Sequence, residues 1–109
     1  MPQQSHAYYR PIGTKGDYLR VEFTTDGAKV LGFVVQLEVV VQGMLRPAIR
    51  FDTAHGFPHV DILNPRGRLI EKKPLSMPLK QALTFAIDDI KVNWDVYRAR
   101  FIDMARSEP

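Results

Sequence analysis

Residues 50–61 read RFDTAHGFPHVD, and this stretch predicts a strand, a tight loop and a second strand. Ile49 and Phe51 alternate with polar residues before the loop, and Val60 and Ile62 do the same after it. Successive side chains of a strand point to opposite faces of a sheet, so one face of this hairpin is apolar and the other polar. The stretch therefore predicts part of an antiparallel sheet with one buried face.

The flanking segments extend this hairpin into a larger sheet. Strands are expected over residues 18–24, 29–41, 47–53, 58–63 and 68–72. Asp26-Gly27 suits the positive φ angles of a hairpin turn, and Asn64-Pro65-Arg66-Gly67 has the residue types of a type I turn.

The last third of the chain predicts one long amphipathic helix. Ser76 suits the N-cap position, and Pro78 fits the first turn, where its missing N–H is harmless. Apolar residues then recur at spacings of three and four, at Leu79, Leu83, Ala86, Ile90, Trp94, Tyr97, Phe101 and Met104. The predicted fold class is α+β: an antiparallel β-meander of four to five strands with one long C-terminal helix packed on one face.

The length of 109 residues fits one domain. Residues 1–16 contain Pro2, Pro11, Gly13 and Gly16, and we expect them to form an irregular N-terminal segment. Residues 17–109 are expected to form a single α+β domain.

The amino-acid composition excludes sites that depend on cysteine and indicates a cellular compartment. The chain has no cysteine, which rules out disulfides and thiolate metal ligands. Its start shows no secretion signal, and its most apolar run, residues 30–41, is too short to span a bilayer. We therefore expect a cytoplasmic protein that does not enter membranes. The net charge of +3 and pI near 9.4 are compatible with RNA or an acidic partner without indicating either.

The polar face of the sheet carries the candidate catalytic residues. They are Arg50, Asp52, His55, His59 and Asp61. His55 and His59 are suited to act as general base and general acid near neutral pH. Arg50 is suited to stabilise charge on phosphate oxygens, and Asp52 or Asp61 to hold an imidazole in its working tautomer. This set predicts metal-independent phosphodiester cleavage, with no cofactor.

Two alternatives use the same residues. Both histidines with Asp52 or Asp61 form a potential metal site, but their spacing matches no recognised ligand motif. The face is also explained as the solvated side of an antiparallel sheet, where mixed charges maintain solubility. In that case the domain is a non-catalytic interaction module that self-associates or engages a protein partner.

Residues 50–61 and the following helix resemble a family of small prokaryotic toxins encoded beside a winged-helix antitoxin. Its members carry an aromatic-Asp-Asn motif, a glycine and a His-x-His motif ahead of a C-terminal helix. Phe51-Asp52-Thr53, Gly56 and His59-Val60-Asp61 occupy these places, within a similarity over residues 33–92. Thr53 replaces the Asn and Asp61 the second His, so His55 would have to substitute for that histidine. The resemblance implies a toxin-like ribonuclease with an antitoxin-like protein partner.

The predicted helix is longer than strands of six or seven residues. We therefore expect Tyr97, Phe101 and Met104 to lie past the sheet edge and to form an interface. The expected partner is a second copy, giving a homodimer, or the antitoxin-like protein. The alternative is that residues 1–16 cover these side chains.

Overall fold

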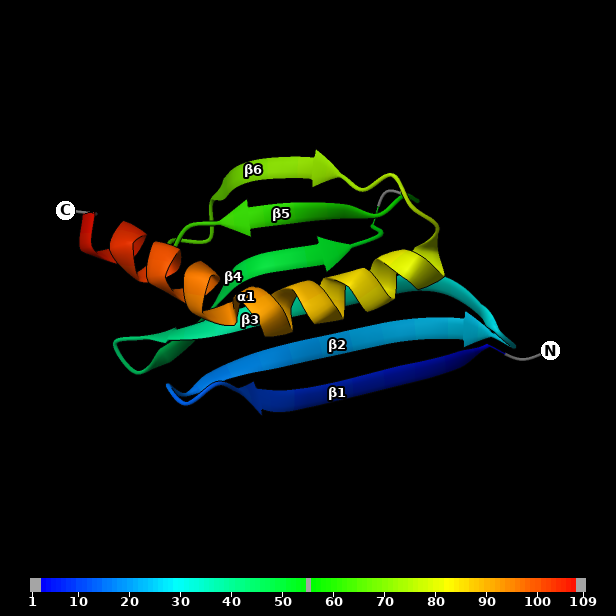
Figure 1. The fold of residues 1–109 in the computed structure, drawn as a ribbon, viewed down its shortest axis with the longest axis horizontal. Coiled ribbons are helices and arrows are strands. Elements are labelled where there is room, and N and C mark those ends of the chain that lie inside the picture. The colour runs from blue at the N-terminus through cyan, green and yellow to red at the C-terminus, as the bar shows by residue number, and fades with distance from the viewer. Residues whose placement is uncertain (1–2, 55, 108–109) are drawn as a thin grey trace.

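The computed structural model describes residues 3–54 and 56–107. These residues form a six-stranded antiparallel sheet whose strands lie in chain order, with one helix packed on one face (Figure 1). The elements are β1 (Gln4–Ile12), β2 (Asp17–Asp26), β3 (Lys29–Val41), β4 (Met44–Asp52), β5 (His59–Leu63), β6 (Leu69–Pro74) and α1 (Leu79–Ser107). The α+β class and the antiparallel meander with a C-terminal helix are confirmed, but the sheet has six strands rather than four to five.

The additional strand is β1, so the expectation of an irregular segment over residues 1–16 is wrong for residues 4–12. β1 pairs along its whole length with β2, from Gln4 opposite Thr25 to Ile12 opposite Asp17. Its position at the edge of the sheet explains how it tolerates Pro11, since an edge strand has one side that needs no ladder hydrogen bonds. The sheet therefore begins near the start of the chain and includes most of the segment that was expected to be irregular.

The expectation that Tyr97, Phe101 and Met104 lie exposed past the sheet edge is wrong. α1 has 29 residues and is about 43 Å long at 1.5 Å per residue. β3 has 13 residues and reaches a similar length, about 43 Å at 3.3 Å per residue. Figure 1 shows the first half of α1 along the middle strands of the sheet, while its last turns reach beyond the ends of β5 and β6. Phe101 is only 1% exposed, and Tyr97 and Met104 are half-buried beside it.

The hydrophobic core lies between α1 and the face of the sheet that it covers. Its sheet members are Leu19, Val21, Val30, Phe33, Val35, Leu37, Val39, Ala48, Ile49 and Phe51. Its helix members are Ala82, Leu83, Ala86, Ile90 and Phe101. Leu19, Val21, Val35, Leu37, Val39, Ile49 and Phe51 are alternate strand positions that the sequence pattern predicts, so the inward face of the sheet is confirmed there. Ala48, which the pattern places on the opposite face, is also buried.

One buried carboxylate joins the sheet to the helix. Asp17, at the start of β2, is fully buried, and its Oδ1 accepts a 3.0 Å hydrogen bond from the backbone N–H of Val40. Its Oδ2 lies 2.9 Å from Nε of Arg98 on α1. This contact fixes the turn after β1 against the second half of the helix.

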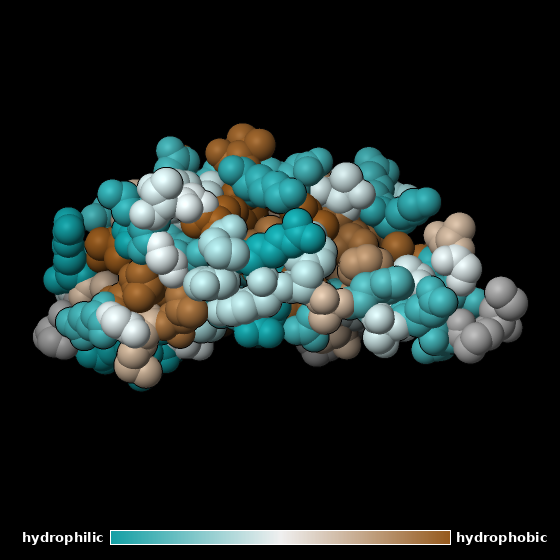
Figure 2. All heavy atoms as spheres, turned by 90° about the horizontal axis from the view of Figure 1, so that it is seen from below, coloured by the Kyte–Doolittle hydropathy of each residue, from teal (hydrophilic) through white to brown (hydrophobic). Residues whose placement is uncertain are grey.

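Hydrophilic residues cover most of the surface on the β1 side, and hydrophobic residues show between them in a band across the middle (Figure 2). Within the described residues, no helix combines the length and the apolar character needed to cross a membrane.

Candidate functional site

The predicted site residues lie on the face of the sheet opposite α1. Strand register places Asp52 directly opposite His59, and Arg50 directly opposite Asp61. The alternate residues Ile49 and Phe51 belong to the core on the helix side. The prediction that Arg50, Asp52, His59 and Asp61 share one face of two adjacent strands is therefore confirmed. His55 lies outside the described residues.

The centre of this face is not the open, solvated surface that was expected. Five of its polar residues are buried: Gln36, Glu38, Asp52, His59 and Asp61. The polar side chains of neighbouring strands lie against one another and exclude solvent, and a period-2 pattern does not encode this. Buried polar groups require partners, so the hydrogen bonds between these residues define the site.

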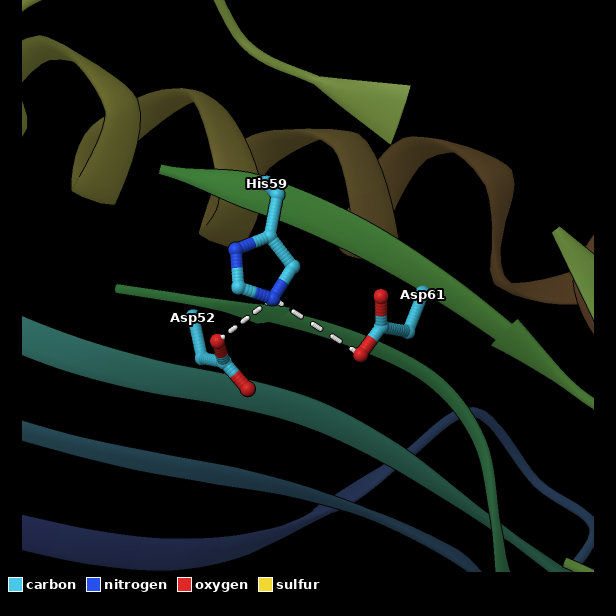
Figure 3. Close-up of side chains that lie close together, drawn as sticks. All are labelled: Asp52, His59 and Asp61. Atoms are coloured by element: carbon cyan, nitrogen blue, oxygen red, sulfur yellow. Dashed lines mark ion pairs between the residues drawn. The ribbon is translucent and has the colours of Figure 1, made fainter. Parts of the chain in front are cut away.

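Asp52, His59 and Asp61 form one compact cluster, which we call the carboxylate–histidine cluster (Figure 3). The Nε2 atom of His59 lies 2.8 Å from Oδ1 of Asp52 and 3.7 Å from Oδ2 of Asp61. Lys72 of β6 approaches from the exposed side, with its Nζ 3.6 Å from Oδ1 of Asp61. The imidazole of His59 is thus placed between two carboxylates.

The other ring nitrogen of His59 faces the backbone. Its Nδ1 lies 3.4 Å from the carbonyl oxygen of Phe57, and the Phe57 ring lies at a centroid distance of 5.8 Å from the imidazole. His59 is only 1% exposed. Both ring nitrogens therefore face oxygen atoms of the protein rather than solvent.

A second cluster surrounds Glu38 on the same face. Its carboxylate accepts hydrogen bonds from the Tyr9 hydroxyl, from Arg20 Nε at 2.8 Å and from Gln36 Nε2 at 2.8 Å. Desolvation, the largest single influence, raises the pKa of Glu38, but the hydrogen bonds from Arg20, Tyr9 and Gln36 outweigh it and lower the pKa. Burial and the contact with Glu38 raise the pKa of Tyr9 to about 12. The carboxylate is therefore held ionised and the phenol protonated.

Arg50 belongs to this second cluster. Its Nε donates a 2.7 Å hydrogen bond to Oε1 of Gln36, whose amide group in turn donates to Glu38. The structure thus brings Asp52, His59 and Asp61 together and directs Arg50 toward Gln36. Sequence reasoning assigned neither Gln36 nor Glu38 to the site. A charged residue inside the apolar run of β3 is the signal that identifies Glu38.

The cluster geometry permits proton transfer between His59 and a carboxylate, and it also permits coordination of a cation.

Comparisons with known proteins do not choose between these chemistries. No curated protein and no solved structure matches the chain. The comparisons also give no support to the resemblance to a toxin family or to an antitoxin neighbour. One family model matches residues 1–107, almost the whole sequence. The chain therefore belongs to the family described as "Domain of unknown function (DUF7718)".

Proposed function

We propose that this domain is a non-catalytic interaction module that self-associates through the exposed side of α1. The observation that carries the proposal is a row of apolar side chains, Phe85, Val92 and Val96, which we call the outer stripe. Val92 is 76% exposed and Val96 58% exposed. The three residues are spaced by seven and four, so they lie on one face of the helix. A row of exposed apolar residues of this kind is typical of a protein interaction site.

A groove continues from the outer stripe across the sheet. α1 runs over the middle strands, and β5 and β6 extend beside it (Figure 1). The groove has a volume of about 280 Å³. Apolar residues Val60, Ile62, Leu75 and Phe85 line it together with the charged residues Glu71, Lys73, Asp89 and Arg100. Phe85 belongs to both features, so stripe and groove form one continuous surface.

This surface favours a second copy of the chain as the occupant. In a two-fold dimer the same patch is used by both copies, and each contact occurs twice. The outer stripe of one copy would then lie in the groove of the other. The groove carries both acidic and basic residues, so its rim is complementary in charge to itself. Such a dimer would remove Val92 and Val96 from water.

Light scattering on the purified protein tests the proposal. The wild-type chain is expected to be dimeric, and Val92→Arg or Val96→Arg is expected to produce monomers, because a buried arginine without a partner is costly. Met44→Arg is the matched control, since Met44 at the β3–β4 turn is 59% exposed and lies outside the stripe. A wild-type protein that stays monomeric at high concentration contradicts self-association. An antitoxin-like protein would then be the remaining occupant for this surface.

The toxin-like ribonuclease is the second candidate function. It is supported by the position of His59 between two carboxylates, since these groups are suited to acid–base work. The burial of His59 weighs against it, because a general acid or base must reach the proton that it transfers. We therefore rank ribonuclease activity below the interaction module.

A further inference from the structure

We propose that Asp52, His59 and Asp61 form a binding site for a divalent first-row transition metal, with Zn²⁺ and Mn²⁺ as representatives. The site lies on the sheet face opposite α1, so it is independent of the proposed interaction surface.

The three side chains converge as metal ligands do. Each offers one ligand atom, and these atoms lie within 4.8 Å of one another. In Figure 3 both carboxylates point toward the same ring nitrogen of His59. Tetrahedral zinc sites have bonds of about 2.0–2.2 Å, which place their ligand atoms about 3.3–3.6 Å apart. The observed separations of 2.8 Å and 3.7 Å from Nε2 bracket this range. Small side-chain rotations toward this range would be needed to hold an ion.

The hydrogen bonding of His59 matches that of a metal-bound histidine. Nδ1 faces the carbonyl oxygen of Phe57 at 3.4 Å, and a carbonyl can only accept, so an N–H on Nδ1 would point at it. With a metal ion on Nε2, the ring would keep its proton on Nδ1. Histidine ligands commonly donate their second N–H to a backbone carbonyl in this way. Without an ion, the 2.8 Å from Nε2 to Oδ1 of Asp52 is the distance of an N–H···O hydrogen bond.

Asp61 supplies an independent observation. It is only 8% exposed, yet its buried Oδ1 has no hydrogen-bond partner among the described residues. Oδ1 faces Lys72, whose Nζ is 3.6 Å away, and Oδ2 faces Nε2 of His59 at 3.7 Å; both distances exceed those of hydrogen bonds. A proton on Nε2 can bond to only one of the two carboxylates, and Asp52 is the closer. A cation would satisfy both.

The ligand set indicates the class of metal. One imidazole nitrogen and two carboxylate oxygens suit Mn²⁺, Fe²⁺, Co²⁺ and Zn²⁺, whereas Ca²⁺ and Mg²⁺ favour sites made of oxygen alone. A surface cavity of about 370 Å³ reaches Asp52 and is also lined by Glu22, Thr53 and Ala54. It provides a route by which an ion can enter from solvent.

Lys72 competes with a bound ion for Asp61. With His59 protonated and Lys72 near Asp61, the four residues also form a neutral ion-pair cluster that needs no metal. The side chain of Lys72 is 40% exposed, so it can turn into solvent when an ion binds. Removing its charge is therefore expected to strengthen metal binding.

Calorimetric titration of the untagged protein with ZnCl₂ and with MnCl₂ distinguishes a metal site from the neutral ion-pair cluster. The proposal expects one ion per chain for at least one of these metals. Asp61→Asn is expected to weaken binding at least about tenfold, and Lys72→Gln is expected to strengthen it. Asp88→Asn, at an exposed position of α1, is the matched control and should bind as the wild type does. Circular dichroism establishes that each variant is folded.

Three results would overturn the proposal. The first is no binding of either metal at protein concentrations near 100 micromolar, roughly the range in which even weak sites are occupied. The second is stoichiometric binding that persists unchanged in both Asp52→Asn and Asp61→Asn. The third is unchanged or weaker binding in folded Lys72→Gln, which would assign the three residues to the neutral ion-pair cluster.

Discussion

The indole Nε1 of Trp94 donates a 2.7 Å hydrogen bond to Oδ2 of Asp17, joining two residues 77 positions apart in the sequence. Asp17 is fully buried at the start of β2, and Trp94 lies in the middle of α1. The same carboxylate oxygen lies 2.9 Å from Arg98 Nε. One aspartate therefore connects the first hairpin of the sheet to the helix.

Replacing Asp17 should strongly destabilise the fold. Asp17→Ala leaves the N–H of Trp94 without its acceptor and the guanidinium of Arg98 without its ion-pair partner, and we expect the free energy of unfolding to fall by about 3 kcal/mol. Urea unfolding followed by the fluorescence of Trp94, the single tryptophan, measures this change. Asp26→Ala at the exposed end of β2 is the control and should change stability by less than about 0.5 kcal/mol. Equal losses in both variants would contradict the role of Asp17.

Gly13 should tolerate a side chain less well than Gly27. Both have positive φ angles, 68° and 60°, so alanine costs backbone strain at either position. A Cβ atom on Gly13 would lie 2.3 Å from the Trp94 ring, whereas nothing lies within 4 Å of one on Gly27. We expect Gly27→Ala to cost about 1 kcal/mol and Gly13→Ala at least about 2 kcal/mol more, as is usual for overpacking. Thermal and urea unfolding of the two variants give the comparison, and similar losses would contradict it.

Glu38 should make stability depend on pH in the acid range. Its folded pKa lies below the ordinary value of 4.5, so its contribution is complete above pH 4.5 and is lost as pH falls through the folded pKa. Glu38→Gln should lower the free energy of unfolding by about 1.5–3 kcal/mol at pH 7, the usual worth of hydrogen bonds to a charged group. The difference from wild type should shrink below pH 4.5. Glu71→Gln, on the exposed strand β6, is the control. A difference that is constant from pH 7 to pH 3 would assign the effect of Glu38→Gln to packing.

The ribonuclease hypothesis predicts a phenotype. Expression of the chain in bacteria should arrest growth, and His59→Ala should relieve the arrest, because loss of an acid–base group slows a reaction by about 10²–10⁴-fold. His6→Ala, at an exposed position of β1, should leave the arrest unchanged. Growth curves and the integrity of cellular RNA are the measurements. Persistent arrest with folded His59→Ala would exclude His59 from the mechanism, and the absence of arrest would favour the interaction module.

The alternation of apolar and polar residues predicted the middle strands of the sheet. β2, β3 and β4 bury one face, so their apolar residues repeat with period 2. β1 was not predicted, because nearly all of its nine residues are exposed and only Tyr8 and Ile12 are partly buried. An edge strand of this kind carries little apolar signal. The overhang of α1 was predicted from strands of six or seven residues, although residues 29–41 were also expected to form a strand of 13 and do so. β4 starts at Met44 rather than at residue 47.

The two-residue repeat of a strand also predicted that the site residues share one face of the sheet. It did not predict that they are buried. Burial at His59 depends on how side chains of adjacent strands meet, and that depends on register. Register shifts occur at Thr24/Thr25, at Leu37/Glu38 and at Ile62/Leu63. The shift at Leu37/Glu38 sets Glu38 opposite Pro47, which has no backbone N–H to offer. Gly32 and Pro47 lie at two of these shifts, and such residues can mark a bulge, but they do not tell which side chains it brings together.

Neighbour-to-neighbour pairing of the strands also affects the order in which the chain can fold. Each strand from β1 to β6 pairs only with the strands that adjoin it in sequence, so every hairpin closes a short loop. Short loop closures are fast, and a fold dominated by nearby contacts crosses a lower entropic barrier. Docking of α1 on β3 brings together segments that are far apart in the sequence and therefore costs the most chain entropy. We expect the hairpins to form early and the helix to dock last, with the burial of Trp94 marking the slowest step.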